Sequence, residues 1–299
     1  MSLMMNLFLQ TYELRSLIDG SWMCIPHVKK DYAMKHRSNS SKLVGCSVSN
    51  VLASLMMSIF WIPAAIAETS TSSSNETSKW GVGAGVAAIQ KPYRDIDVDV
   101  LPLPLFSYEN RWISASIPKV DLKFLSNESF TLSLRAKYAG DGYDADDSPF
   151  LTGMDDRKGG VWAGGAMMWK TGIVDLSAEI LGEVSGYSKG SRAKLQAEKR
   201  FASGTFGLTP RFAVEWVDSK FVDYYYGVKR SEVRVDRSFY EGNSTTNMEV
   251  GIRMDYTMAR QHTLFLDASA TRFGSGIKDS PLVDNSSQTS VSIGYIYRF

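Results

Sequence analysis

Residues that could support catalysis are scarce in this sequence. Its three histidines are His27, His36 and His262. We expect the first two to be removed on export, so His262 is the imidazole that a hydrolase of the Ser–His–Asp type would have to use as its base. It follows a short predicted turn at Ala259, where a solvated side chain is the simpler interpretation. We therefore predict that the protein is not an enzyme and has no catalytic residue or cofactor.

An acidic loop is the second place where chemistry could occur. Residues 139–158 hold six aspartates: Asp141, Asp144, Asp146, Asp147, Asp155 and Asp156. Oxygen-rich loops can hold calcium, and at a cell surface they could contact cations bound to lipopolysaccharide. The spacing is not that of an EF-hand, and a solvated loop with a local ion network around Arg157 and Lys158 explains it too. We assign no metal site to this loop, and calcium binding stays open.

An aromatic run in the excursion 218–243 is the third candidate. Phe221 and Tyr240 lie near three consecutive tyrosines there. Large apolar rings on a loop often mark a contact surface, but they could equally fold over a barrel mouth as a lid. The candidate interaction residues are therefore Tyr224, Tyr225, Tyr226, Asp155, Asp156 and Arg157.

Strands, rather than helices, must position these groups. From Trp80 onward, apolar and polar residues alternate with the period of two that β-strands show, as in Phe206, Leu208, Phe212 and Trp216. Helical spacing would bring apolar residues back at three and four, and no stretch shows it convincingly. The candidate strands are 80–90, 98–108, 111–125, 128–138, 159–169, 172–183, 191–201, 204–217, 245–258, 260–273 and 287–299.

Alternation alone does not distinguish a soluble sandwich from a transmembrane barrel. Aromatic residues at the ends of many apolar faces resemble the interfacial girdles of a barrel, and short connections alternate with long ones. These aromatics are Tyr138, Trp169, Phe201, Trp216, Tyr256, Phe273 and Phe299. We therefore predict an all-β protein, a transmembrane antiparallel up-and-down β-barrel over residues 80–299.

The number of strands is less certain than their type, because barrels of this kind take an even number and eleven is odd. One N-terminal segment could fall short of a full span, since Pro102, Pro104 and Pro118 each remove a ladder hydrogen bond. Alternatively, the excursion 218–243 hides a strand. The prediction is ten to twelve strands.

The last ten residues carry the strongest barrel signal. In SVSIGYIYRF, Tyr295, Tyr297 and Phe299 share one face of a strand, with Ile296 as the exception on the other face. A closing strand with lipid-facing aromatics and a terminal Phe is typical of outer-membrane barrels. We interpret Tyr295, Tyr297 and Phe299 as the C-terminal signal read by the barrel assembly machinery.

Charged residues fall on the face that would line a lumen. In a narrow barrel they could pair and plug the lumen or line a small pore, and we favour pairing because unpaired charges are costly in a confined space. The inward positions are Arg135, Lys137, Asp175, Glu179, Lys194, Glu198, Arg200, Arg211, Glu215, Glu249, Arg253, Asp255 and Asp267.

The N-terminal region has the features of an export signal. The apolar run 51–67 ends in Ala65-Ile66-Ala67 and follows a basic stretch, so we predict a signal peptide cleaved after Ala67 rather than a membrane anchor. Residues 1–67 are long for such a leader, and translation could begin at Met34. Cleavage would remove both cysteines, Cys24 and Cys46. Residues 68–79 are polar and predicted to be a flexible lead-in.

Composition excludes other classes. The formal net charge is +1, which gives no indication of nucleic-acid binding. The mean hydropathy of −0.16 excludes a protein with many transmembrane helices but not a barrel, because half of each barrel strand faces a polar lumen.

Several loop motifs together resemble the MipA/OmpV family of Gram-negative outer-membrane proteins. The matching pieces, which run through residues 83–299 in the family's order, are Gly83-Ala84-Gly85-Val86, Lys91-Pro92-Tyr93-Arg94-Asp95, the stretch 97–104 (DVDVLPLP), Asp155-Asp156-Arg157-Lys158, Tyr224-Tyr225-Tyr226-Gly227-Val228, the stretch 279–284 (DSPLVD) and Tyr295-Ile296-Tyr297-Arg298-Phe299.

The resemblance implies an outer-membrane barrel among lipid and lipopolysaccharide. It also implies a scaffold that joins a lytic transglycosylase to a murein synthase. The alternatives are a narrow passive channel for small solutes and a surface adhesin.

Overall fold

The computed structural model describes residues 78–96 and 98–299. The predicted extension and signal peptide over residues 1–67, the alternative start at Met34 and the cleavage after Ala67 lie outside the described residues. Residues 68–77 of the predicted lead-in also lie outside the described residues. Lys79, its last residue, is the first residue of a strand.

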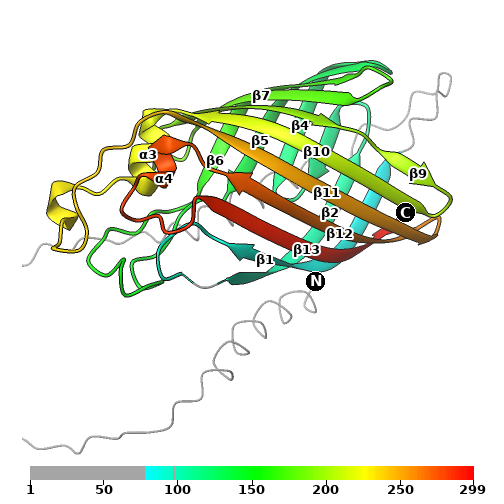
Figure 1. Ribbon diagram of the computed structural model, residues 1–299. Coiled ribbons are helices and arrows are strands. Elements are labelled where there is room, and N and C mark those ends of the chain that lie inside the picture. The colour runs from blue at the N-terminus through cyan, green and yellow to red at the C-terminus, as the bar shows by residue number, and fades with distance from the viewer. Residues whose placement is uncertain (1–77, 97) are drawn as a thin grey trace, which may run out of the picture. The chain divides into compact units, whose positions relative to one another are not determined.

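Strands form one antiparallel sheet that closes on itself (Figure 1). The strands are β1 (Lys79–Gln90), β2 (Asp99–Glu109), β3 (Ile113–Ser116), β4 (Lys119–Ser126), β5 (Phe130–Ala139), β6 (Gly160–Lys170), β7 (Asp175–Glu183), β8 (Ser191–Glu198), β9 (Phe201–Ser203), β10 (Phe206–Val217), β11 (Thr245–Ala259), β12 (His262–Arg272) and β13 (Ser287–Arg298). β1 pairs with β2 on one side and with β13 on the other, which completes the ring. β8 and β9 both pair with β10, so they are two parts of one strand. The described chain is therefore a closed antiparallel barrel of twelve strands, which confirms the predicted fold and lies within the predicted ten to twelve strands.

The odd count of eleven arose from one segment. The predicted strand 111–125 is wrong as a single span, because it is a hairpin of two short strands, β3 and β4, that reverses at Ile117 and Pro118. Proline cannot continue the ladder of a paired strand, which is why the segment divides there. By contrast, β2 keeps its full length despite Pro102 and Pro104.

The excursion 218–243 contains no strand that spans the barrel. It forms the helix α3 (Ser219–Tyr226) and the short 3-10 helix η1 (Arg230–Glu232), and a second short helix, α4 (Ser275–Lys278), lies in a later loop. The prediction that no stretch is helical is therefore wrong for α3, whose eight residues are too few to show a repeating pattern. None of the helices in the described part of the chain is long and apolar enough to cross a membrane.

Side chains alternate across the barrel wall as predicted. On β10, Phe206, Phe212 and Trp216 are exposed on the outer face, whereas Arg211 and Glu215 are partly buried in the lumen. Apolar side chains on the outside and charged ones inside suit a protein surrounded by hydrocarbon. The wall thus has the polarity of a membrane barrel rather than that of a soluble sandwich.

The seam between the first and last strands is tight. β1 and β13 pair from Gly81 with Arg298 to Gln90 with Thr289. A Cβ atom added at Gly83 would lie 2.0 Å from the backbone oxygen of Tyr295, so only glycine fits there. The N–H of Phe299 donates to the carbonyl of Trp80 (2.9 Å). The C-terminal strand therefore closes the barrel, and its role as an assembly signal stays a prediction.

Candidate functional site

The two ends of the barrel differ. Short turns and the C-terminus lie at one end, and the long loops with α3, η1 and α4 lie at the other (Figure 1). Outer-membrane barrels have short periplasmic turns and long external loops, so the long-loop end faces outward. We call residues 91–96, 140–159, 218–244 and 273–286 at this end the loop cap.

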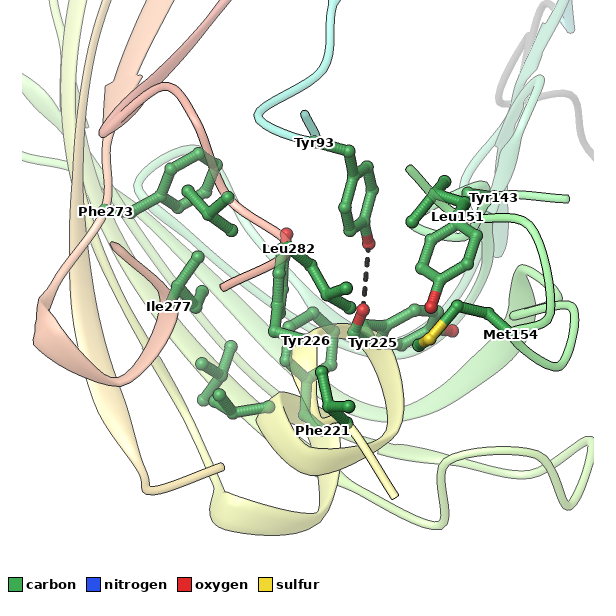
Figure 2. Close-up of a cluster of buried hydrophobic side chains, with 14 of the residues drawn as sticks. Tyr93, Tyr143, Leu151, Met154, Phe221, Tyr225, Tyr226, Phe273, Ile277 and Leu282 are labelled. Carbon is green, nitrogen blue, oxygen red and sulfur yellow. Dashed lines mark hydrogen bonds between the residues drawn. The ribbon is translucent and has the colours of Figure 1, made fainter. Parts of the chain in front are cut away.

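The loop cap has a hydrophobic core of its own. Its buried members come from several loops and from the adjoining strand ends (Figure 2). They are Tyr93, Tyr143, Phe150, Leu151, Met154, Trp162, Leu181, Val217, Phe221, Val222, Tyr225, Tyr226, Val228, Phe273, Ile277, Leu282 and Val283. Burying one large apolar side chain stabilises a structure by about 1.5–3 kcal/mol. A cluster of this size therefore holds the loops as a packed unit over the barrel mouth.

Helix α3 supplies the base of this core. Asp218 caps its first turn by accepting the N–H of Phe221 (2.9 Å), and Gly227 follows its last residue. Phe221, Val222, Tyr225 and Tyr226 fall at i, i+1, i+4 and i+5, which places them on one face. The helix is amphipathic and buries this face.

Tyr93 ties three segments of the loop cap together. Its side chain is 1% exposed, and its hydroxyl lies 3.3 Å from the carbonyl of Tyr225 and 3.1 Å from that of Asp141 (Figure 2). Its ring stacks on Tyr226 at a centroid distance of 5.3 Å. The loop after β1 is thereby joined to α3 and to the acidic loop.

The structure places the candidate tyrosines in or against the core. Tyr225 and Tyr226 are buried, and Tyr224 is half-buried with its hydroxyl accepting the N–H of Lys158 (3.0 Å). As a correction, Tyr225 and Tyr226 cannot offer their rings to a partner in this conformation. Their burial agrees with the alternative in which the aromatic rings fold over the barrel mouth as a lid.

A buried ion pair joins the acidic loop to η1. Arg157 Nη2 lies 2.9 Å from both carboxylate oxygens of Glu232, and these side chains are 2% and 3% exposed. Backbone N–H groups of Asp155 (3.0 Å) and Lys229 (2.9 Å) donate to the same carboxylate. Burial alone would raise the pKa of Glu232, but these N–H groups and the guanidinium of Arg157 outweigh it and lower the pKa.

Arg237 makes a second buried link that the sequence did not indicate. Its side chain is 1% exposed, and its guanidinium donates to the carbonyls of Glu232 (2.9 Å) and Phe150. Glu232 and Arg237 lie far in sequence from the loop that they hold, and no local pattern marks them. Arg157, in contrast, was among the candidate residues, although as a contact residue rather than a buried anchor.

The loop cap is expected to weaken in acid. Because the folded pKa of Glu232 is below its ordinary value of 4.5, its contribution is fully present above that value and is lost as the pH falls through the folded pKa. The denaturant midpoint of the near-ultraviolet circular dichroism of the buried aromatics should therefore fall between pH 7 and about pH 3. The denaturant midpoint of Glu232→Gln should fall by less over this pH interval. An equal fall in both proteins would contradict this role for Glu232.

Two aspartates of the acidic loop form ion pairs with cations from other segments. Asp155 and Asp156 are exposed, and Asp155 pairs with Lys229 (2.6 Å), which lowers the pKa of that carboxyl. Asp141 pairs with Arg192 (3.2 Å). Among residues 78–96 and 98–299, no group of three or more His, Cys, Asp or Glu side chains is arranged to hold a metal ion. These ion pairs agree with a local ion network in the loop, and calcium binding stays open.

Most of the predicted inward charges pair in the lumen. Arg135 binds Asp121 on β4 (Nε to Oδ1, 2.7 Å) and Glu179 on β7 (Nη1 to Oε2, 2.6 Å). Further pairs join Lys137 to Glu179, Lys194 and Arg211 to Glu249, Arg211 to Asp267, Arg192 to Glu215, and Arg200 and Arg253 to Asp255. Arg253 and Asp255 lie on the same strand, and the other pairs join neighbouring strands or strands separated by one other strand, so the network follows the wall. A polar cavity of about 580 Å³ remains beside it, between β3 and β8.

His262 lies at the short-turn end. It is half-buried at the start of β12, and its Nδ1 is 2.7 Å from the hydroxyl of Tyr295. Its ring also contacts that of Tyr297 at a centroid distance of 5.1 Å. These contacts make it part of the seam, where it packs between strands.

Exposed apolar residues of the loop cap lie elsewhere than predicted. Val233, Val235 and Phe239 are 44%, 110% and 44% exposed in the segment after η1, which projects beyond the barrel end (Figure 1). A surface adhesin would need an external surface of this kind. Sequence reasoning missed it because the adjacent tyrosine run was the stronger signal.

Comparisons with known proteins agree with this architecture. The family model described as MltA-interacting protein MipA matches residues 82–299. The MltA-interacting protein of Escherichia coli (strain K12) is 29% identical over 237 residues, which cover 77% of this chain and 94% of the relative. Outer membrane protein OmpV of Vibrio cholerae is 24% identical, and outer membrane protein Omp26La of Vibrio anguillarum is 23% identical. Both alignments span 223 residues and cover 74% of this chain and 87% of the relative.

Proposed function

Because the chain belongs to the MipA family of outer-membrane β-barrel proteins, we propose that it acts as a non-enzymatic scaffold for a peptidoglycan-remodelling enzyme. The relative from Escherichia coli is, by its name, a protein that interacts with MltA. The corresponding partner of this chain would be a lytic transglycosylase, and a murein synthase would be the second. The barrel itself is an outer-membrane protein of the family's type.

The observation that carries this proposal is the packed loop cap. A solute channel needs an open path at its outer mouth. Here Tyr93, Phe221, Tyr225, Tyr226 and the rest of the aromatic core fill the space over that mouth. A barrel closed in this way is better suited to holding a partner than to passing solutes.

The partner must bind at the short-turn end. An enzyme that acts on peptidoglycan works in the periplasm, whereas Asp155, Asp156, Arg157 and the tyrosines of the loop cap lie at the external end. The candidate interaction residues therefore do not serve this partner. The exposed Asp155 and Asp156 are left for external contacts, such as cations bound to lipopolysaccharide.

The short turns carry an excess of positive charge. Outside the paired strands at this end, Arg111, Lys199 and Arg260 stand against one carboxylate, that of Glu128, whereas Arg200 pairs with Asp255 in the lumen. Three cations minus one anion leaves a net charge of +2 on this surface. A positive surface favours a partner with an acidic face, and it acts most strongly at low salt.

Charge reversal at these turns tests the proposal. The double substitution Lys199→Glu and Arg260→Glu should lower the capture of a purified lytic transglycosylase on the immobilised full chain by about tenfold at low salt. Lys220→Glu makes one such charge reversal in α3, at the external end, and this variant should capture the enzyme as well as the unaltered chain does. Binding at the periplasmic turns would be contradicted if the double substitution left the capture unchanged, or if Lys220→Glu abolished it.

A further inference from the structure

The barrel wall has an unpaired edge along β2. β1 pairs with β2 throughout, from Asp99 to Glu109. On its other side, β3 pairs only with Ser107–Glu109, because the β3–β4 hairpin reverses at Pro118. Among the residues that the structure describes, no strand hydrogen-bonds to this side of residues 99–105. These seven residues form an unpaired strand edge about 23 Å long, and we call the gap between this edge and the β3–β4 hairpin the opening.

Two prolines keep this edge from accepting another strand. The carbonyl of Phe106 accepts the N–H of Ile117 (3.3 Å), so the even-numbered residues of β2 direct their backbone groups toward the opening. Pro102 and Pro104 share this direction and lack an N–H, which leaves the N–H of Val100 alone over that stretch. Prolines are a common protection of free strand edges. The geometry therefore favours a lasting opening over a seam that a partner strand would complete.

The opening lies in the lipid-facing wall. Val100, Pro102 and Pro104 point outward and are exposed, as are Ile117 and Val120 beside the hairpin. Backbone carbonyls do not face hydrocarbon unless they line a hydrated cavity or are covered. The edge therefore connects the bilayer with the interior of the barrel.

An apolar surface continues from this edge into the lumen. Leu101, Leu103 and Leu105 face inward, and Leu103 lies opposite Gly85, which in turn lies opposite Gly294. Gly85 and Gly294 have no side chains to occupy the space. Leu105 and Phe265 instead pack over the bare backbone of Gly294. This part of the inner wall can hold hydrocarbon.

A cation without a partner stands at the foot of the opening. Lys119 follows Pro118 directly, shares the inner face of β4 with Asp121, and lines the lumen cavity of about 580 Å³. Its amine makes no hydrogen bond or ion pair within the described residues, whereas the neighbouring Arg135 and Lys137 are both paired. A half-buried cation of this kind favours an anion beside it.

We propose that this opening admits an anionic membrane amphiphile. The hydrocarbon chain lies along Leu101, Leu103 and Leu105, and the carboxylate or phosphate of the headgroup binds Lys119. The apolar strip can bind hydrocarbon and the Lys119 amine can bind a negative charge. Both lie within a few residues of the edge. A fatty acid and a phospholipid share this chemistry, and the binding experiment below separates them.

Cysteine accessibility from the bilayer tests the opening. In full-length protein with Cys24→Ser and Cys46→Ser, single cysteines are placed at Leu103, Thr209 and Leu208, and the barrel is reconstituted with a phospholipid carrying a maleimide on its acyl chain. Thr209 faces the lumen on β10, which has β11 on one side and β8 with β9 on the other, and Leu208 faces lipid. Leu103→Cys should react within about threefold of Leu208→Cys and at least about tenfold faster than Thr209→Cys. Reaction as slow as that of Thr209→Cys would overturn the opening.

Binding to the purified full chain in non-ionic detergent tests the role of Lys119. Palmitate, dipalmitoyl phosphatidylglycerol and dipalmitoyl phosphatidylethanolamine are compared by native mass spectrometry. Lys119→Gln should weaken the binding of the anionic ligand at least about tenfold, and Lys119→Arg should retain it. Preference for palmitate or for phosphatidylglycerol identifies the source. Equal binding of the zwitterionic lipid, or no effect of Lys119→Gln, would overturn the assignment.

Discussion

Replacing Gly83 with valine should prevent closure of the barrel. Even the first side-chain carbon would lie 2.0 Å from the backbone oxygen of Tyr295, and a backbone atom cannot move away as a flexible side chain can. Overpacking of a well-packed site typically costs about 1–3 kcal/mol and occasionally more. Here the clash would also disrupt the hydrogen bonds that join the first strand to the last. We expect the folded fraction to drop more than tenfold in refolding from urea, measured by the heat-sensitive mobility shift on gels.

Gly165 provides the matched control for this substitution. It lies on the outer face of β6, and an added Cβ would have no heavy atom within 4 Å. Gly165→Val should therefore fold like the unaltered protein, because both strands tolerate a β-branched residue and only one site is crowded. If both variants fold equally well, the first and last strands are not paired as described.

Replacing Arg157 with methionine should open the loop cap. The substitution leaves the Glu232 carboxylate buried without its cation, and breaking one side of a buried pair typically costs 3–5 kcal/mol. Because the pair joins the acidic loop to η1, this loss should appear as faster hydrogen exchange of amides in residues 140–159 and 228–240. Exchange in the barrel strands should change little, since those amides are protected by the closed ladder.

Two further variants distinguish loss of the Arg157–Glu232 pair from general destabilisation of the loop cap. Lys229→Met removes the exposed pair between Lys229 and Asp155, which joins the same two segments of the loop cap. The two side chains are 59% and 68% exposed, so the loss should cost no more than about 1 kcal/mol. The double variant Arg157→Met with Glu232→Gln removes both charges and should recover much of the lost protection. Equal effects of Arg157→Met and Lys229→Met would contradict a buried anchor.

The barrel could be predicted from sequence because its signals are local. The alternation of Phe206, Leu208, Phe212 and Trp216 follows directly from the pleat of a strand, and the same pattern recurs along the chain. The hairpin at Pro118 was missed for a physical reason, since a tight turn within an alternating run does not interrupt the alternation. Proline was the available clue, and it was read only as a weakening of the strand.

The loop cap could not be predicted from sequence because its contacts are distant in the chain. Arg157 and Glu232 are 75 residues apart, and Tyr93 contacts Tyr225 across 132 residues. Helix α3 is stabilised by burial of one face rather than by a long helical pattern. The luminal charges were identified as inward and paired, but their partners follow from strand register, as Arg211 with Asp267 shows.

The central claim is that the loop cap closes the outer mouth of this barrel. The protein therefore acts by binding a partner rather than by passing solutes. Single-channel recording of the full-length protein in planar bilayers tests this most directly. We predict no resolved conductance steps at neutral pH with the loop cap intact. Steady, porin-like steps from the unaltered protein would contradict the account and favour the narrow channel.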